Sequence, residues 1–261
     1  MTHLEHNRLA WNKESAGRGP WSIPVDPEVI RAAREGDWSV VLTPRRPVPR
    51  EWFGDIRGKE VLGLASAGGQ QLPVLAAAGA KVTSFDLSEE QLARDREVVE
   101  REGLDMRFVR GDMADLSVFP DSSFDLVFHA VSNVFVPDVV AVWREAFRVL
   151  RPGGELLAGF MNPMYFLFDH DQAERSGLLV VKYKLPYSEP WSLEGEARRR
   201  WEEAGAAYQY GHSLETQIGG QTDAGFAIVG LYEDGWSDAA TPLNRYAPVA
   251  IATRARKPAA R

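Results

Sequence analysis

The sequence predicts an α/β fold in which a mostly parallel β-sheet carries helices on both faces. From Lys59 onward, short apolar segments alternate with segments in which apolar residues recur at helical spacing. The apolar segments contain few polar residues, which is typical of strands covered on both sides. The last two apolar segments are joined by a loop alone, as in an antiparallel terminal pair. A ligand of such a sheet binds at the carboxyl ends of the strands, where the strand order reverses.

The composition narrows the class of protein. With 261 residues, of which 44% are apolar and 26% charged, the chain is long enough for one large domain. The absence of cysteine excludes disulfides and thiolate metal sites. The 30 Lys and Arg residues against 37 Asp and Glu leave a net charge of −7, which disfavours a nucleic-acid partner.

The sequence shows no signal for a membrane or for secretion. No apolar run approaches the roughly 20 residues that a membrane span needs. The segment MTHLEHNRLAWNKESAG lacks the apolar core and cleavage site of a secretory signal. We therefore expect a cytoplasmic protein without a membrane partner. The oligomeric state is not indicated.

Residues 1–50 are predicted to form an N-terminal segment that covers the ligand site, and residues 51–261 the main domain. The segment is irregular and rich in Trp and Pro, with one helix between Asp26 as its cap and Gly36 at its end. Its aromatic side chains are expected either to fold over the site or to cover the edge of the sheet. They are Trp11, with its neighbour Asn12, Trp21 and Trp38.

The first half of the main domain is predicted as strand, helix, strand, helix and strand. KEVLGLA is a strand that ends in a turn of small residues, and a helix follows through QLPVLAAAGA. KVTSFD is the second strand and MRFVR the third. The helix between them is well marked, because Ser88 and Gln91 form a capping box and Gly103 suits its end.

The second half continues the alternation and then interrupts it. FDLVFHAV is the fourth strand, residues 138–150 form a helix that Arg151-Pro-Gly-Gly ends, and GELLAGF is the fifth strand. Residues 164–211 are predicted to be a lid insertion, with two strands around a charged stretch. Residues 213–225 form a further helix, and FAIVGLYED and PVAIATRAR are the terminal strands.

A turn of small residues, Leu64-Ala-Ser-Ala-Gly-Gly-Gln-Gln, follows the first predicted strand. Small residues at a helix start let a ligand approach the backbone and its free N–H groups. The alternative is a tight connection without a ligand. The turn does not match the GxGxxG pattern of dinucleotide oxidoreductases, which disfavours that class of enzyme.

Carboxylates follow the second and third predicted strands. Asp86 can accept hydrogen bonds from both ribose hydroxyls of an adenosine-containing ligand, and the alternative role of helix cap is already filled by Ser88. Asp112 can accept from an adenine amino group while Met113 packs on the base. The alternative is that this pair belongs to a polar loop without a ligand. The pair lies at the same sheet edge as Asp86, which favours a role in ligand binding.

Together these features resemble the class I S-adenosylmethionine-dependent methyltransferases. The resemblance rests on the small-residue turn, the acid that ends the second strand, GDM after the third, FDLVFHAVSN at the fourth and LRPGG before the fifth. It covers about residues 59–162, with the final helix and strand pair. It implies a Rossmann-like, seven-stranded sheet with an antiparallel last strand, and S-adenosyl-L-methionine as cofactor.

The resemblance also implies site residues. The turn near residues 65–69 lies against the methionine part of the cofactor, Asp86 holds the ribose, and Asp112 and Met113 hold the adenine. The full set of candidate cofactor-binding residues is Ala65, Ser66, Gly68, Gly69, Gln70, Asp86, Leu87, Asp112, Met113 and His129.

This chain departs from the family pattern in the turn. The family has an acid at the position of Gly63 and glycines at the positions of Ala65 and Ala67, and only Gly69 matches a family glycine. The amino group of the cofactor therefore needs another partner. The candidates are Asn12, Gln70 and Ser66.

His129 is the candidate general base. It ends the fourth predicted strand at the expected site, and the pKa of an unperturbed imidazole is near neutrality. The alternative, which the resemblance favours, is a backbone contact to the cofactor. Ser132 and Asn133 are candidates for orienting a polar substrate, with a capped loop as their alternative.

Further candidates for the substrate pocket lie on or near the insertion, and solvated lid residues are the alternative. They are His170, which Asp169 can orient, Tyr183, Tyr187 and His212; with Trp11, Asn12, Ser132 and Asn133 they complete the substrate-binding set. No pair of His or carboxylate residues has metal-binding spacing, so we expect no metal.

The expected function is S-adenosylmethionine-dependent methyl transfer to a small molecule. Alignment of the two reactants lowers such a barrier by about 7–11 kcal/mol, and a base is needed only where the acceptor atom must lose a proton. The alternative is a methyltransferase-like module that binds the cofactor or a partner without catalysis, which the altered turn favours. The acceptor atom, whether O, N, C or S, is not indicated.

Overall fold

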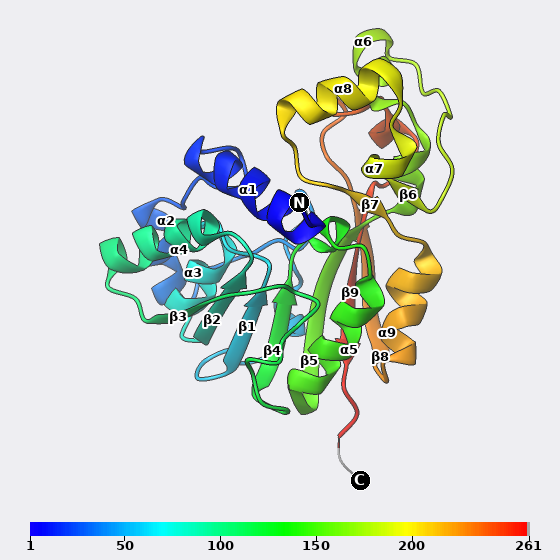
Figure 1. Cartoon of the computed structure of the whole chain (residues 1–261). Coiled ribbons are helices and arrows are strands. Elements are labelled where there is room, and N and C mark those ends of the chain that lie inside the picture. The colour runs from blue at the N-terminus through cyan, green and yellow to red at the C-terminus, as the bar shows by residue number, and fades with distance from the viewer. Residues whose placement is uncertain (260–261) are drawn as a thin grey trace.

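The computed structural model describes residues 1–259 and contains a seven-stranded sheet in the order β3-β2-β1-β4-β5-β9-β8. β9 runs antiparallel to both of its neighbours, and the pairs among β1 to β5 are parallel, which confirms the predicted sheet (Figure 1). The strands are β1 (Glu60–Leu64), β2 (Lys81–Asp86), β3 (Met106–Arg110), β4 (Phe124–His129), β5 (Leu150–Met161), β8 (Ala227–Asp234) and β9 (Ala250–Arg256).

Helices lie on both faces of this sheet, as predicted. They begin where the sequence supplies caps: the Ser88 hydroxyl accepts the Gln91 N–H, and the Asp138 carboxylate accepts the Val140 N–H. The helices around the sheet are α2 (Pro27–Arg34), α3 (Gln71–Ala77), α4 (Glu89–Glu102), α5 (Val139–Val149) and α9 (Gly220–Asp223), which continues a π-helical turn at Glu215–Gly219. Within residues 1–259 no helix has both the length and the apolar character to cross a membrane.

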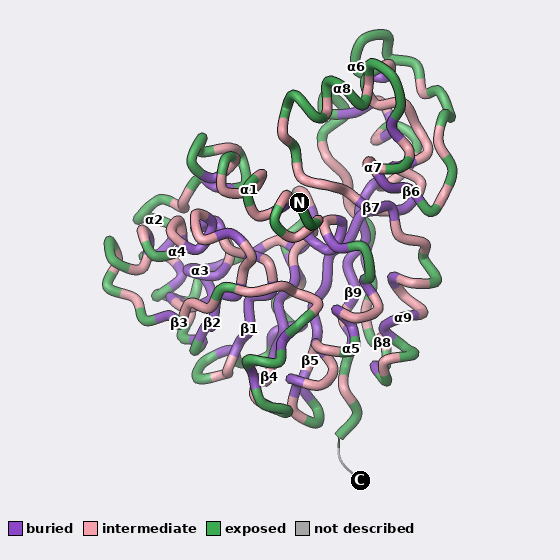
Figure 2. The backbone as a smooth tube through the Cα atoms, in the orientation of Figure 1, coloured by how far each residue is buried: buried purple, intermediate pink, exposed green. Residues whose placement is uncertain are grey.

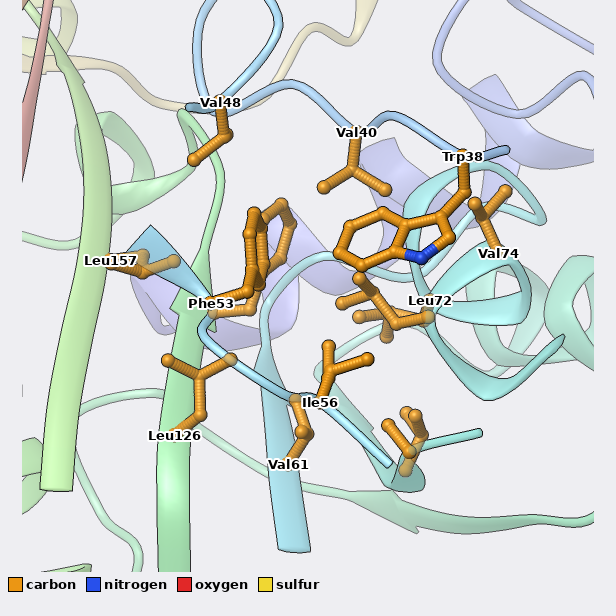
Figure 3. Close-up of a cluster of buried hydrophobic side chains, with 14 of the residues drawn as sticks. Trp38, Val40, Val48, Phe53, Ile56, Val61, Leu72, Val74, Leu126 and Leu157 are labelled. Carbon is orange, nitrogen blue, oxygen red and sulfur yellow. The ribbon is translucent and has the colours of Figure 1, made fainter. Parts of the chain in front are cut away.

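The N-terminal segment covers one face of the sheet with a hydrophobic cluster. Trp38 and Phe53 meet edge to face, with ring centroids 5.0 Å apart, and pack over Val61 of β1 and Leu126 of β4 (Figure 3). Arg50 lies over the Trp38 ring at 3.6 Å. Trp38 therefore covers a face of the sheet, and neither the cavity nor the edge of the sheet, the two roles considered for the N-terminal aromatic residues. On the opposite face, α5 forms a separate cluster around Trp143.

The helix at the N-terminus was not expected. α1 (His3–Ala16) begins at Thr2, whose hydroxyl accepts the Glu5 N–H at 3.2 Å. The prediction of irregular structure here was wrong, because α1 has no continuous apolar stripe that a sequence pattern can reveal. α1 is held instead by polar contacts to its neighbours, with Arg8 bonded to Glu89 of α4.

Residues 162–212 form a cap above the carboxyl ends of the strands, with its outer helices exposed (Figure 2). The two predicted strands shrink to two residues each, and the charged stretch between them is a helix with its charges exposed. The elements are a 3₁₀ turn (Pro163–Leu167), α6 (His170–Ser176), β6 (Tyr187–Ser188), α7 (Glu189–Ser192), α8 (Gly195–Ala204) and β7 (Tyr210–Gly211). Further 3₁₀ turns span Arg50–Trp52, Asn133–Phe135 and Pro242–Arg245.

Candidate active site

A cavity of about 450 Å³ lies at the carboxyl ends of the strands. It straddles β1 and β4, the neighbouring strands between which the order of the sheet reverses. Its walls come from the segments that follow β1, β2, β3 and β4, and from α1 and the cap. This volume lies in the range of about 300–1,000 Å³ that is usual for small-molecule sites.

The turn after β1 brings its backbone to the cavity through residues 65–67. Ala65 has a φ of +48°, and its N–H donates to the Phe85 carbonyl at 2.8 Å. A residue with a Cβ in this left-handed conformation costs about 1 kcal/mol relative to the right-handed one. The turn therefore stores a small strain where glycine is the usual residue.

Gly68 and Gly69, two of the predicted cofactor residues, do not line this cavity. A Cβ at Gly68 would lie 2.4 Å from the Trp21 carbonyl oxygen, and one at Gly69 would lie 2.9 Å from the Cα of Pro24. The Val25 N–H donates to the Gly69 carbonyl at 2.8 Å. These glycines therefore let the N-terminal segment approach the back of the turn.

Asp86, at the end of β2, faces the cavity. Its Oδ1 accepts the Ser88 N–H at 2.9 Å and its Oδ2 the Ala67 N–H at 3.4 Å. Within residues 1–259 no Lys, Arg or His pairs with it, and burial raises the pKa of this carboxyl to about 6. Free lone pairs of a desolvated carboxylate are thus available to hydroxyl donors in the cavity.

Leu87, Asp112 and Met113 also line the cavity, as the sequence predicted. The Asp112 Oδ1 accepts the Ala114 N–H at 3.0 Å, which fixes the loop after β3. The segments after the first three strands therefore present two carboxylates and two apolar side chains to one part of the cavity.

The geometry argues against His129 as a general base. Its ring does not line the cavity, and its Nδ1 lies 2.8 Å from the Leu64 carbonyl oxygen, which can only accept, so Nδ1 carries the proton. The Nε2 is buried without a partner, and the ring meets Trp143 edge-on at 5.9 Å. Burial lowers the pKa of His129 to about 4. The side chain is a neutral core group below the site.

Of the predicted substrate residues, the structure brings Trp11 and Ser132 to the cavity. Asn133 is fully buried and exchanges amide hydrogen bonds with Gln217 at 2.9 and 3.2 Å. His212 bonds to the Val136 carbonyl at 2.9 Å. Both side chains therefore fix the loop after β4 and do not face the cavity.

The predicted residues of the cap pack inside the cap. His170 stacks on Tyr165 at 3.9 Å and bonds to its carbonyl oxygen, and the Asp169 carboxylate pairs with Lys182 instead of orienting that ring. Tyr183 and Tyr187 meet at 5.2 Å in a hydrophobic cluster. Of the side chains in these contacts only Tyr165 lines the cavity; the predicted His170, Tyr183 and Tyr187 do not.

Asn12, Gln70 and Ser66 were the candidates to bind the amino group of the cofactor in place of the acid. All three make hydrogen bonds to other groups of the protein. The Ser66 hydroxyl donates to the Leu64 carbonyl at 2.9 Å and accepts the Ala130 N–H at 3.1 Å, so it joins the turns after β1 and β4. The Gln70 amide donates to the Pro20 carbonyl at 2.9 Å, and the Asn12 amide oxygen accepts the Ser88 hydroxyl. Ser66 and Gln70 still line the cavity; Asn12 does not.

Several lining residues were missed by the sequence reasoning. They come from distant parts of the chain, and most are apolar, so no local pattern distinguishes them from core residues. They are Leu4, Asn7, Val41, Leu42, Thr43, Pro44, Gln71, Gln91, Val131, Val134, Phe135, Val136, Met161, Tyr165, Gln209 and Trp236.

Comparisons with known proteins agree with this geometry. A crystal structure of an S-adenosylmethionine-dependent methyltransferase from Mesorhizobium loti matches 79% of this chain and 94% of its own, with a TM-score of 0.59 and 23% identity. A family model described as a methyltransferase domain matches residues 62–158. A Bacillus subtilis (strain 168) protein, uncharacterized methyltransferase YbaJ, is 49% identical over 231 residues, which are 88% of this chain and 90% of that protein.

The chain belongs to the S-adenosylmethionine-dependent methyltransferase family. It is therefore an enzyme, and its cofactor is S-adenosyl-L-methionine, so the alternative of a non-catalytic module is set aside. The sterol 24-C-methyltransferase erg6 of Aspergillus fumigatus is 27% identical over 213 residues, which are 63% of this chain and 56% of that protein.

The departure of this methyltransferase at Gly63 has a steric cause. A Cβ at Gly63 would lie 2.3 Å from both terminal methyl carbons of Leu72. Leu72 is fully buried in the cluster beneath β1. The leucine thus occupies the space that a side chain at position 63 would need.

The residues around the cavity fit the cofactor of the family. Its adenosine carries two ribose hydroxyls that need acceptors, and the Asp86 carboxylate faces the cavity without a cationic partner among the residues that the structure describes. Leu87 and Met113 supply apolar surface for a base beside Asp112. The ribose hydroxyls of the cofactor are donors, and the Asp86 carboxylate is the acceptor that they need.

Proposed function

We propose that this methyltransferase acts on a small, uncharged and largely apolar molecule. The cofactor supplies a methyl group on a cationic sulfur, and the protein aligns the acceptor atom with it. The observation that carries the proposal is the lining of the cavity on the side of β4, β5 and the cap. There the walls are formed by Val131, Val134, Phe135, Val136, Met161, Tyr165 and Trp236.

In this proposal Asp86 accepts the ribose hydroxyls, and Asp112, Leu87 and Met113 surround the adenine. This part of the cavity lies along β1, β2 and β3, on one side of the point where the strand order reverses. The backbone of residues 65–67 then faces the methionine part. The acceptor occupies the remaining, apolar part beyond β4.

Charge supports an uncharged acceptor. The charged side chains that line the cavity are Asp86 and Asp112, and within residues 1–259 no His, Lys, Arg or Glu lines it. An anionic acceptor would therefore lie in a largely apolar environment without a cationic side chain, so that only the sulfonium of the cofactor would offset the cost of burying its charge.

No side chain that lines the part of the cavity beyond β4 is suited to remove a proton from the acceptor, because the two lining carboxylates, Asp86 and Asp112, lie on the side of β2 and β3. Burial raises the pKa of Tyr165 to about 12, so its phenol stays protonated near neutral pH. We infer that the acceptor atom attacks with an electron pair that is free before any proton is lost.

The relatives support the apolar character of the acceptor but not its lack of charge, which rests on the lining of the cavity, since geranyl diphosphate carries a charged diphosphate. The printed names include sterol 24-C-methyltransferases, and one solved structure is a geranyl diphosphate methyltransferase in complex with GPP and sinefungin. That structure has a TM-score of 0.57 and 16% identity, and it covers 79% of this chain and 74% of its own. For this chain we propose only the shared apolar character, together with a cytoplasmic location and no nucleic-acid partner.

Methyl transfer from labelled S-adenosylmethionine tests the proposal. A panel of uncharged isoprenoid alkenes and thioethers, which attack with a free electron pair, is compared with carboxylic acids of the same carbon number. We expect product from members of the uncharged set alone. Transfer to the carboxylic acids at equal or higher rates would contradict the proposed acceptor class, while leaving the cofactor site unaffected.

A matched variant sharpens this test. Val134→Asp introduces a charge into the apolar part of the cavity, and we expect it to abolish transfer to uncharged acceptors while S-adenosylhomocysteine still binds. Val118→Asp is the control, because Val118 is 53% exposed and does not line the cavity. Equal activity of the two variants would contradict the placement of the acceptor.

A further inference from the structure

Asp95 of α4 is a buried carboxylate that does not line the cavity. It is 0% exposed. Its Oδ1 accepts the Gly69 N–H at 2.7 Å, and its Oδ2 accepts the Ser84 hydroxyl at 2.7 Å. Asp95 thus joins α4 to the turn after β1 and to β2. Within residues 1–259 no Lys, Arg or His pairs with it.

This arrangement is costly for a residue of the core. A carboxylate removed from water without a cation loses hydration that two hydrogen bonds replace only in part. Burial, with a smaller contribution from the nearby Asp86, raises the pKa of Asp95 to about 7, although its hydrogen bonds lower it. An apolar residue would fill the same space without this cost, so the carboxylate has a role besides packing.

Asp95 contacts Gly69, at the far end of the turn whose residues 65–67 line the cavity. The Gly69 N–H donates to the Asp95 carboxylate, and the Gly69 carbonyl accepts the Val25 N–H at 2.8 Å. A Cβ at Gly69 would lie 2.9 Å from Pro24 and 3.0 Å from the Arg94 carbonyl. The turn is therefore fixed at its far end from two directions, and its near end is the strained Ala65.

The end of β1 next to the turn offers no carboxylate, because Glu60 lies at the opposite end of this strand. Gly63 stands where the family has an acid, and Leu72 fills the space beside it. Asp95 brings a carboxylate to the same turn from the opposite side, from a helix.

We propose that Asp95 is a positioning residue for the cofactor: by holding the Gly69 N–H it fixes the turn in the conformation that presents residues 65–67 to the methionine part. It acts through the backbone of the turn and does not itself touch the cavity. The proposal concerns cofactor binding and does not depend on the identity of the acceptor.

Calorimetric titration with S-adenosylhomocysteine tests it with three variants. Asp95→Ala removes the acceptor of Gly69, and we expect the Kd to rise by about tenfold or more, the effect of losing one charge-assisted hydrogen bond. Asp95→Asn keeps an oxygen for the Gly69 N–H and should bind within about threefold of the unmodified protein. Ser84→Ala breaks only the other hydrogen bond and should also bind within about threefold.

Two outcomes would overturn the proposal. One is a folded Asp95→Ala protein that binds within about threefold of the unmodified one. The other is a loss in Ser84→Ala as large as that in Asp95→Ala, which would make Asp95 part of a core pair with Ser84 and nothing more. Circular dichroism establishes whether each variant is folded.

A measurement on the unmodified protein decides the matter if Asp95→Ala does not fold. Amide hydrogen exchange of Gly69 is followed by NMR in the free protein and with S-adenosylhomocysteine. We expect this amide to be protected in both states, because Asp95 holds it before the ligand binds. Rapid exchange in the free protein would contradict the proposal.

Discussion

Asp86 combines two opposite requirements at one residue. Its carboxylate must face the cavity to accept hydroxyl donors, yet burial there raises its pKa to about 6. A raised pKa means that the folded protein binds a proton more readily than the unfolded chain. The unfolding free energy therefore falls as the pH rises from about 4 to about 6, and the loss persists above that range.

This balance predicts that Asp86→Asn stabilises the ligand-free protein. The amide keeps an oxygen for the Ser88 N–H and removes the charge that burial disfavours. At pH 8 we expect a gain on the order of 1 kcal/mol and a Tm higher by about 2–4 °C, and at pH 4 little difference. Thermal unfolding followed by circular dichroism measures both. A lower Tm for the variant at pH 8 would show that burial of the Asp86 charge does not destabilise the folded protein.

At the same scale, residue type and position after a strand identified Asp86, Leu87, Asp112 and Met113, all of which line the cavity. His129 was also correctly placed at the end of β4, yet its ring points into the core. A strand alternates its side chains between two faces, and the sequence does not show which face the last residue takes. Gly68 and Gly69 serve the approach of Trp21 and Pro24, a contact across the chain that spacing does not encode.

Helix α1 illustrates what the sequence hides at the scale of an element. Asn7 is 2% exposed and lines the cavity. Its amide nitrogen donates to the Phe135 carbonyl at 2.9 Å and to the Tyr208 carbonyl at 3.2 Å, and its oxygen accepts the Tyr208 N–H at 2.7 Å. His6 stacks on Tyr208 at 3.9 Å. Polar contacts of this kind join α1 to the loop after β4 and to the cap, and none has a sequence signature.

We expect α1 to close the cavity and to leave for ligand exchange. Asn7→Ala leaves three backbone groups of Phe135 and Tyr208 without their partner, which weakens the closed state. S-adenosylhomocysteine should then dissociate faster by about tenfold, an effect of about 1.4 kcal/mol. Stopped-flow displacement measures the rate.

Arg18→Ala is the matched control for this prediction. Arg18 follows α1 and pairs with Glu97 of α4 at 3.2 Å, but the pair is exposed and contributes little. We expect an unchanged dissociation rate in this variant. The same acceleration in both variants, or in neither, would contradict the role of Asn7 in closure.

At the scale of the whole molecule, the predicted architecture was confirmed because buried parallel strands and well-capped helices have strong local patterns. The order of the strands places the ends of β1 and β4 side by side, and with them the turn, Asp86 and the loop after β4. The cap and the cavity were less predictable. The residues that the cap contributes to the cavity, Tyr165 and Gln209, were not predicted, since packing between distant segments decides which side chains face inward.

We propose that this methyltransferase binds its cofactor along β1, β2 and β3, with Asp86 as the acceptor of the ribose hydroxyls. Calorimetric titration of the unmodified protein and of Asp86→Ala with S-adenosylhomocysteine tests it directly. We predict micromolar binding by the unmodified protein, weakened by about 100-fold or more in the variant, since two hydrogen bonds to a charged group are lost. Equal binding by the two proteins, or no binding by the unmodified one, would contradict the account.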